Sequence, residues 1–264
     1  MMNSDSGAEQ PQELTAQDLK YATDLLSYVS ASLIENGAET RLAEQMPARL
    51  AKAFGLSDIQ ISVEPSYAVV RSGSAVSFAK INGFGTNFRY VTNIGRLCIH
   101  AETGKIKDFR ALSHRISAIH RSKYSLWLLI PFTGFACGTF ALLSGAHYLP
   151  ALTAAVAASF GSAIKFLMIK GRFNVLPIFA TSAFCSVSAA EIMELVLSMS
   201  PVGDPSIVAA VLYLIPGVPL MNSVLDGIKG FYLMAVVRLT EALMLIFSAV
   251  LGIFVASFLF GGIL

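Results

Sequence analysis

The sequence is poor in charge and in cysteine, and each shortage excludes a class of protein. Only 14% of the 264 residues are charged, and the net charge of +2 is too small and too dispersed to attract nucleic acid. The three cysteines show no CxxC or Cys/His spacing, which argues against a disulfide framework and a structural zinc site. We therefore expect no metal, no cofactor and no nucleic-acid partner.

Catalytic motifs are also missing from the sequence. There is no GxSxG, no HExxH and no phosphate-cradling loop, and the four histidines are scattered along the chain. A Walker motif is also absent, so the sequence gives no sign of ATP hydrolysis. We expect no catalytic residues and predict that the protein is not an enzyme.

Apolar residues are plentiful, and they are concentrated in one half of the chain. Hydrophobic residues make up 55% of the sequence and crowd into the part after Tyr124. This pattern is typical of an integral membrane protein. We predict a disordered leader at 1–12, a cytoplasmic α+β domain at 13–123 and a transmembrane helical domain at 124–264. The leader is polar and acidic, without the apolar run of a signal peptide.

The predicted cytoplasmic domain combines helices with short strands. Helical spacing of apolar residues predicts helices at 15–36 and 39–54, with Gly37 as the cap between them and Pro47 as a kink. Alternating β-rich runs between 59 and 91 predict three or four antiparallel strands, the last of them NFRYV. Further helices follow, and the last of them, around 109–119, leads into the membrane.

The C-terminal half predicts five transmembrane helices. Each apolar run is long enough to cross a hydrocarbon core of roughly 30 Å. Lys and Arg flank the first span, follow the second and follow the fourth, so the positive-inside rule predicts a cytoplasmic N-terminus and a periplasmic C-terminus. Asp204 before Pro205 suits the start of a helix. The predicted spans are 124–143, 148–168, 175–199, 206–223 and 232–260.

A proline-rich break interrupts the fourth predicted span. Pro216 and Pro219 flank Gly217 in LIPGVPL, which we expect near the middle of the bilayer. One interpretation is a kinked helix whose neighbours satisfy the freed carbonyls. The other is a discontinuous helix, whose second half, from Leu220 onward, points its positive N-terminal end at an anionic substrate. Asn222 and Asp226 follow, and would either line an inner vestibule or cap the helix.

Charged side chains within the predicted spans are the other candidates. Arg238 and Glu241 share a helix face, where they form an intrahelical pair or face a polar cavity. Lys165 either extends its charge to the cytoplasmic interface or binds substrate. Glu191 and Glu194 lie in the outer part of the third span, where an exposed rim is favoured over a proton or cation relay.

Two stretches resemble the threonine/serine exporter family, in its N-terminal part of a soluble α+β region followed by five membrane helices. These are NGAETRLAEQMPARLAKAFG and LIPGVPLMNSVLDGIKGFYLMAVVRLTEAL, and the resemblance extends from about Leu19 onward. Single-chain members continue into a second membrane domain. This chain ends after its fifth predicted span, as does the larger subunit of the split, two-subunit form. Pro47 and the Glu191–Glu194 pair do not match the family pattern.

The resemblance implies a bacterial inner-membrane exporter that acts with a small membrane protein and forms an oligomer. Its substrate would be a carboxylate metabolite, with succinate or a related dicarboxylate favoured and threonine or serine as the alternative. From another class, a membrane-tethered enzyme or sensor with an active cytoplasmic domain stays open. The expected substrate-binding residues are Lys165, Pro216, Gly217, Pro219, Asn222, Asp226, Arg238 and Glu241.

Overall fold

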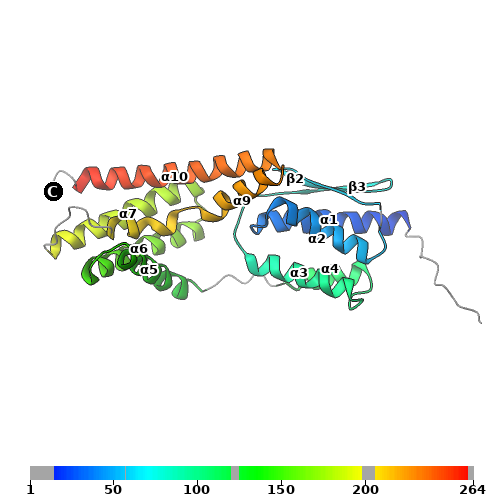
Figure 1. The fold of residues 1–264 in the computed structure, drawn as a ribbon, viewed down its shortest axis with the longest axis horizontal. Helices are drawn as coiled ribbons and strands as arrows, with labels where there is room; N and C mark the ends of the chain where they lie inside the picture. The colour runs from blue at the N-terminus through cyan, green and yellow to red at the C-terminus, as the bar shows by residue number, and fades with distance from the viewer. Residues whose placement is uncertain (1–14, 57, 120–124, 198–205, 261–264) are drawn as a thin grey trace, which may run out of the picture. The chain divides into compact units, whose positions relative to one another are not determined.

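The computed structural model of the chain describes residues 15–56, 58–119, 125–197 and 206–260. These residues form two compact units (Figure 1). Unit 1 combines residues up to Arg121 with Val218–Arg238, and unit 2 combines Ser122–Gly217 with Leu239–Leu264. The predicted leader and the predicted helix start at Asp204 lie outside the described residues. The predicted boundary at 123/124 stays a prediction, because compactness does not locate the lipid.

Unit 1 begins with α1 (Ala16–Glu35), which starts as the sequence predicts. The side chain of Thr15 accepts a hydrogen bond from the Asp18 N–H at 3.2 Å and so caps the first turn. Leu26, Val29 and Leu33 lie on one face of the helix and are completely buried. This apolar stripe anchors α1 in the core of unit 1.

A three-stranded antiparallel sheet packs against α1. It consists of β1 (Gln60–Val63), β2 (Tyr67–Ser72) and β3 (Ala75–Lys80) in sequence order. Ile61 pairs with Val70 across β1 and β2. The hydroxyl of Ser77 on β3 donates to the hydroxyl of Thr23 on α1 at 2.7 Å, and both residues are buried.

The expected fourth strand, NFRYV, is wrong, because this segment opens α3 (Phe88–Glu102). The side chain of Asn87 accepts a hydrogen bond from the Tyr90 N–H and caps the helix. Tyr90, Val91 and Ile94 are then buried at helical rather than alternating spacing. Packing on this face decides the conformation of a run rich in aromatic residues.

The remaining helices of the N-terminal part are α2 (Thr40–Ala53) and α4 (Phe109–Ser117), both near the predicted positions. Pro47 lies inside α2. The C-terminal part of unit 1 consists of α9 (Gly217–Ile228), from Val218 on, and the first turns of α10 (Tyr232–Phe260). Met234 of α10 is buried in the same hydrophobic core as α1 to α4.

Unit 2 is a helical unit that packs through small residues. Its elements are α5 (Leu126–Leu143), α6 (Tyr148–Lys170), α7 (Val175–Val196), α8 (Ser206–Val211), η1 (Leu212–Leu214) and the rest of α10. Ala157 of α6, Ala190 of α7 and Ala210 of α8 form one buried cluster. Alanine at such contacts allows close approach of helices, as is usual in membrane proteins.

The prediction of five spans is wrong in number. Among the described residues, α6, α7 and α10 are long and apolar enough to cross a membrane, which gives 3 spans, or up to 4 if a bent helix pair is one span. The apolar stretch of α5 among the described residues, Trp127–Leu143, is shorter than these three spans and is not counted with them. The bent pair occupies the predicted fourth span.

The fourth predicted span is interrupted, as the discontinuous-helix interpretation requires. It consists of Ser206–Leu214 and Gly217–Ile228, joined at a sharp bend. Ile215 is extended, with ψ of 122°, and Pro216 follows it without helical structure. Pro219 lies in the first turn of α9, where a missing backbone donor has no consequence for helix hydrogen bonding. The break therefore separates two distinct helices and is not a kink within a single helix.

Candidate functional site

The connection between α1 and α2 is a tight turn whose backbone forms the centre of a buried polar network in unit 1. Gly37 has a φ of +91°, and the Ala38 N–H donates to the Leu33 carbonyl at 3.0 Å, as in a Schellman cap. A Cβ atom on Gly37 would also lie 2.9 Å from the Gly85 carbonyl oxygen. Glycine is thus required here both by conformation and by space.

Asp226 of α9 caps α2 from a distance of 186 positions along the chain. The residue at the N-cap, Glu39, forms no side-chain cap of its own. Instead the carboxylate of Asp226 accepts hydrogen bonds from the Thr40 N–H and the Thr40 hydroxyl, each at 2.9 Å. A carboxylate at this place also interacts favourably with the positive end of the helix dipole.

Arg238 of α10 completes the network from the other side of Asp226. Its Nη1 atom lies 2.9 Å from Asp226 Oδ2, and its Nη2 donates to the Ala38 carbonyl at 2.8 Å. The guanidinium also lies over the Phe84 ring, 5.4 Å from the centroid. With 2% of Arg238 and none of Asp226 exposed, this is a fully buried ion pair.

Two further contacts hold the same turn. Asn222 of α9 donates to the Gly37 carbonyl at 3.0 Å. Lys229 forms an ion pair with Glu39. The structure thus brings together Asn222, Asp226 and Arg238, three of the predicted site residues, around the connection between α1 and α2.

The space beside Pro219 and Arg238 is small. A void of about 10 Å³ is lined by residues that include Asn222, Phe84 and Val218. This is about the volume that one water molecule requires. In the conformation described, a metabolite does not fit there, so binding at this place requires the region to open.

Lys165 lies in unit 2, within α6 and five residues before its end. Its ammonium lies 4.6 Å from the centroid of the Phe179 ring on α7 and 5.5 Å from that of Tyr213 on η1. Among the ion pairs of the described residues, none includes Lys165. Aromatic faces stabilise a cation without neutralising it, so the site retains a positive charge.

Two hydroxyl groups pack against Gly161, which lies one turn before Lys165 on α6. A Cβ atom on Gly161 would lie 1.8 Å from Ser186 Oγ and 2.5 Å from the Tyr213 hydroxyl. These two hydroxyls are hydrogen-bonded to each other at 3.1 Å. Ser182, one turn from Ser186 on α7, is fully buried, and its hydroxyl has no hydrogen-bond partner among the described residues. Lys165 thus lies one helical turn from a pair of hydroxyl groups, and a cation and hydroxyl donors are groups that suit a carboxylate.

The other predicted site residues are placed as follows. Glu241 is half-buried on α10, one turn after Arg238, and belongs to unit 2. Arg238 forms the ion pair with Asp226 described above, and the intrahelical pair of Arg238 with Glu241 stays a prediction. Pro216 and Gly217 form the break before α9.

The expectation of an exposed rim at Glu191 and Glu194 is wrong. Only 7% of Glu191 and 2% of Glu194 are exposed. The hydroxyl of Ser206, on α8, donates to Glu194 Oε1 at 2.6 Å. Counting residues from the end of a span placed these carboxylates in water, but α6 and α8 cover them.

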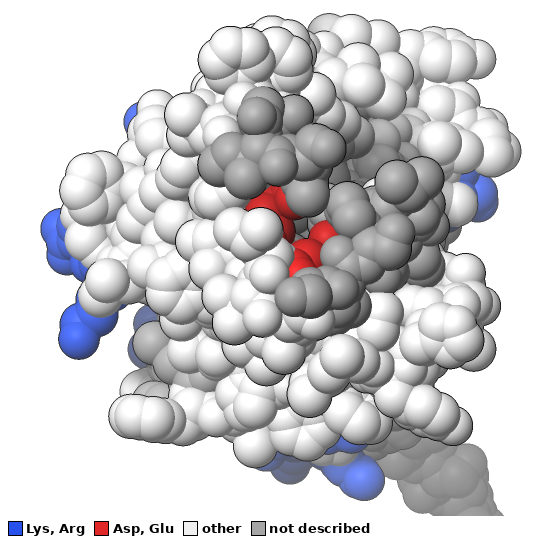
Figure 2. Space-filling view, turned by 90° about the vertical axis from the view of Figure 1, so that its left-hand side faces the viewer, with Lys and Arg blue, Asp and Glu red and all other residues white. Residues whose placement is uncertain are grey.

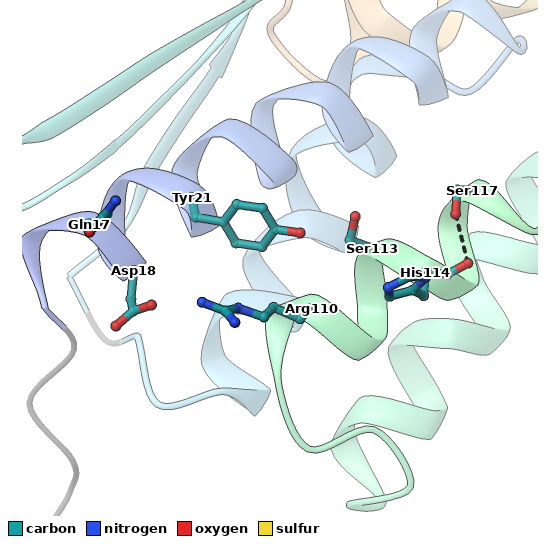
Figure 3. A pocket seen from close by; sticks show the side chains of 7 residues that line it. All are labelled: Gln17, Asp18, Tyr21, Arg110, Ser113, His114 and Ser117. Atoms are coloured by element: carbon teal, nitrogen blue, oxygen red, sulfur yellow. Dashed lines mark hydrogen bonds between the residues drawn. The ribbon is translucent and has the colours of Figure 1, made fainter.

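A surface cleft of about 530 Å³ lies between α1 and α4 in unit 1 (Figure 3). Arg110 of α4 points toward Asp18 and Tyr21 of α1, and His114 lies further along the same wall. The cleft contains charges of both signs, and most of its side chains are exposed. It belongs to the part of the chain predicted to lie outside the membrane.

Sequence reasoning missed several residues of the buried network. Ala38 accepts through its backbone carbonyl, which leaves no residue-type signal. Thr40 donates through its backbone N–H and its hydroxyl, and Phe84 contributes only its ring face. Gly37 and Glu39 were noticed as part of the family pattern, but not as partners of α9. A signal was present in that pattern, since the two most specific stretches of the resemblance are the two that contact each other.

Comparison with known proteins agrees with the geometry. The chain is 26% identical over 233 residues to "Probable succinate transporter subunit YjjP" of Klebsiella aerogenes. The aligned region covers 87% of this chain and 90% of the relative. The chain is 25% identical over 233 residues to the protein of the same name from Escherichia coli, covering 87% and 91%. No solved structure matches the chain.

A family model covers nearly the whole of both units. The model named ThrE and described as "Putative threonine/serine exporter" matches residues 24–260. This range includes both partners of the buried ion pair, Lys165, and the broken helix. The chain therefore belongs to the ThrE family of threonine/serine exporters and is a membrane transporter.

Proposed function

We propose that the chain is the larger subunit of a bacterial inner-membrane exporter of a small carboxylate, with succinate or a related dicarboxylate favoured. The observation that carries this proposal is the pair of relatives named as succinate transporter subunits, about nine-tenths of whose length aligns with this chain. The word subunit in those names supports a second, small membrane protein as partner. The N-terminus would be cytoplasmic and the C-terminus periplasmic.

Lys165 is the proposed carboxylate contact. A charged side chain at the centre of a membrane helix raises the free energy of insertion by about 2.5–3.5 kcal/mol. Such a residue is therefore usually functional. Lys165 is half-buried, is not neutralised by an ion pair among the described residues, and lies beside the hydroxyls of Ser186 and Tyr213. A substrate carboxylate would supply the missing negative charge.

The network around Arg238 is the proposed second element. The guanidinium of Arg238 forms an ion pair with the carboxylate of Asp226. The substrate would present the same chemical group, a carboxylate. We propose that opening beside Pro219 lets a substrate carboxylate replace Asp226. The N-terminal end of α9, freed by Pro216 and Gly217, would then add its dipole to the attraction. Asn222 would line the opened region.

The alternative substrate is an amino acid, which the family description favours. Threonine and serine also carry a carboxylate, so Lys165 fits both classes. A dicarboxylate presents a second negative charge, whereas an amino acid presents an ammonium group. Competition between succinate and threonine for the same exporter distinguishes these two.

The deciding experiment measures efflux of labelled succinate and threonine from cells that contain this chain, its proposed partner, both or neither. We expect succinate efflux only when both are present. Lys165→Met should reduce efflux at least tenfold, and Lys165→Arg should preserve part of it. Lys170→Met, at the exposed end of the same helix, is the matched control. Efflux of neither compound, or equal efflux by the Lys165→Met variant, would contradict the proposal.

A further inference from the structure

The carboxylate of Asp226 is held by three donors that suit the carboxylate of a ligand equally well. Its Oδ1 accepts from the Thr40 N–H and its Oδ2 from the Thr40 hydroxyl, each at 2.9 Å. Nη1 of Arg238 lies 2.9 Å from the same Oδ2. Thr40 and Asp226 are completely buried, and only 2% of Arg238 is exposed. We call the donor groups of Thr40 and Arg238 the carboxylate receptor.

The donors of the carboxylate receptor are held in place by contacts other than Asp226. Thr40 is the first residue of α2, so the helix backbone orients its N–H. Nη2 of Arg238 donates to the Ala38 carbonyl at 2.8 Å, and the Phe84 ring lies beside the guanidinium. Because these donors are already oriented, little free energy is lost when one carboxylate replaces another.

Two groups of different origin make the receptor attractive to an anion. One is the positive N-terminal end of α2, and the other is the buried guanidinium of Arg238. The adjacent acid, Glu39, forms its ion pair with Lys229. A buried cation that loses its carboxylate is strongly destabilising. Departure of Asp226 therefore creates a site that requires another anion.

The helix that carries Asp226 is bounded by a non-helical residue on each side. Ile215, before α9, is extended with ψ of 122°, and Gly230, after it, has φ of +87°. A Cβ atom on Gly217 or Gly230 would meet no atom within 4 Å, so the backbone is not tightly packed at either end. Hinge motions use such residues at the ends of elements. Rotation of α9 at these points would withdraw Asp226 and leave the receptor on α2 and α10.

The face of the molecule drawn in Figure 2 offers no comparable site among its described residues. Most of the described surface there is uncharged, and the charged side chains near its centre are Asp and Glu. Such a surface does not attract a carboxylate. The buried receptor differs from it because a guanidinium and a helix N-terminus converge on one place.

We propose that Asp226 is an internal ligand of the carboxylate receptor, and that a carboxylate of the transported compound takes its place when α9 moves. Thr40 is then the residue that recognises the incoming carboxylate, through its N–H and its hydroxyl. While Asp226 is bound, the receptor is closed, so this contact is autoinhibitory. The exchange for a substrate rests on the proposed exporter function, whereas the affinity of the receptor for a carboxylate does not.

The receptor favours a dicarboxylate over an amino acid. Threonine and serine carry an ammonium group on the carbon next to the carboxylate. In the receptor, that group would lie close to the guanidinium of Arg238 and to the positive end of α2, where like charges repel. A dicarboxylate has an uncharged methylene at the same position.

The first test removes the internal ligand and offers a free one. Asp226→Gly deletes a methylene and a carboxylate, which together correspond to acetate. Sodium acetate should raise the thermal unfolding midpoint of this variant of the full chain by several degrees relative to sodium chloride, because the ligand binds only the folded state. Wild type and Asp226→Asn should not respond. Addition of Arg238→Met or Thr40→Val to Asp226→Gly should remove most of the shift.

A second variant repeats this test without a glycine in the helix, where glycine is itself destabilising. Asp226→Ala leaves room for formate, which should raise its unfolding midpoint in the same way. If neither variant responds to its carboxylate, or if wild type responds as strongly, the receptor is overturned.

The next experiment asks whether the receptor binds the transported compound. The calorimetric affinity of the chain with its proposed partner for succinate should fall at least fivefold in Thr40→Val and stay close to wild type in Thr40→Ser, which keeps both donors. Thr103→Val is the matched control, because the Thr103 hydroxyl is exposed and donates only within its own helix. Unchanged succinate affinity in Thr40→Val would overturn the exchange. If wild type binds and exports no carboxylate, the exporter function fails, and the acetate experiment still decides the receptor.

Discussion

The buried pair of Asp226 and Arg238 should dominate the stability of unit 1, and a double-mutant cycle measures how strongly. Asp226→Leu leaves the guanidinium of Arg238 buried without its carboxylate and also removes the acceptor for two donors of Thr40. Removal of one partner from such a pair costs about 3–5 kcal/mol. Arg238→Met leaves the carboxylate with Thr40 only, and we expect a loss at the lower end of that range.

The double variant should be much less damaging than the sum of the two single changes. Two apolar side chains of similar volume leave no buried charge, and such replacements are often close to neutral. We therefore expect a coupling energy of at least about 2 kcal/mol. The exposed pair of Arg49 and Glu102, at 2.7 Å in the same unit, is the matched control, and Arg49→Met with Glu102→Gln should show little coupling.

Cys98 provides the assay, because it is fully buried in the core of unit 1. With the other two cysteines replaced by serine, thiol labelling in increasing guanidinium reports the unfolding of this unit alone. Single variants that unfold at the same denaturant concentration as wild type would refute the reasoning. A double variant as unstable as the sum of the singles would show that the two side chains act independently.

Four further predictions follow from the geometry. Gly161→Ala should reduce both stability and transport, measured by thermal unfolding and efflux, because the new methyl group meets two hydroxyls. Replacing Pro216 and Pro219 by Ala should lower succinate affinity in calorimetry if the break exposes a helix N-terminus to substrate, whereas unchanged affinity would leave the break a packing feature. Burial raises the pKa of Cys98 to about 11, so its thiolate fraction at neutral pH falls below that of a free cysteine, and labelling of the folded protein should be slower than of a model thiol. An impermeant thiol reagent should label Ser144→Cys in intact cells and should not label a cysteine in the loop after α6, and the reverse pattern would contradict the predicted orientation.

The sequence predicted elements whose local signals agree with their packing. Thr15 at the start of α1 and Gly37 at its end both take part in caps whose hydrogen bonds involve only near neighbours in the sequence. The prediction of a strand at NFRYV was wrong, although its residues suit a strand. The buried helix face that Tyr90 shares with Ile94 exists only once α3 packs against its neighbours. The predicted count of spans was wrong at α5, whose described apolar stretch is shorter than those of α6, α7 and α10.

The sequence predicted several residues of the buried network but not the partners that they contact. Asn222, Asp226 and Arg238 were selected as charged or polar side chains in apolar segments, which is a sound signal for a buried role. Besides the ion pair between Asp226 and Arg238, their partners are groups of residues 37–40, which precede them by about 185 to 200 positions. No property of a single residue indicates such a pairing. The burial of Glu191 was likewise set by α6 and α8 rather than by its own helix.

Arg238 and Lys165, the two cations among the expected substrate-binding residues, differ in whether another charge of the chain compensates them. Arg238 has an ion pair with Asp226, a carbonyl acceptor at Ala38 and an aromatic face, so its charge is balanced before any substrate arrives. Lys165 has aromatic faces and nearby hydroxyls, but no carboxylate pairs with it among the described residues. An anion gains more from the uncompensated cation, because binding there breaks no existing ion pair. We therefore propose that a substrate carboxylate is captured first at Lys165, and that Arg238 contributes only in a conformation in which Asp226 has moved away.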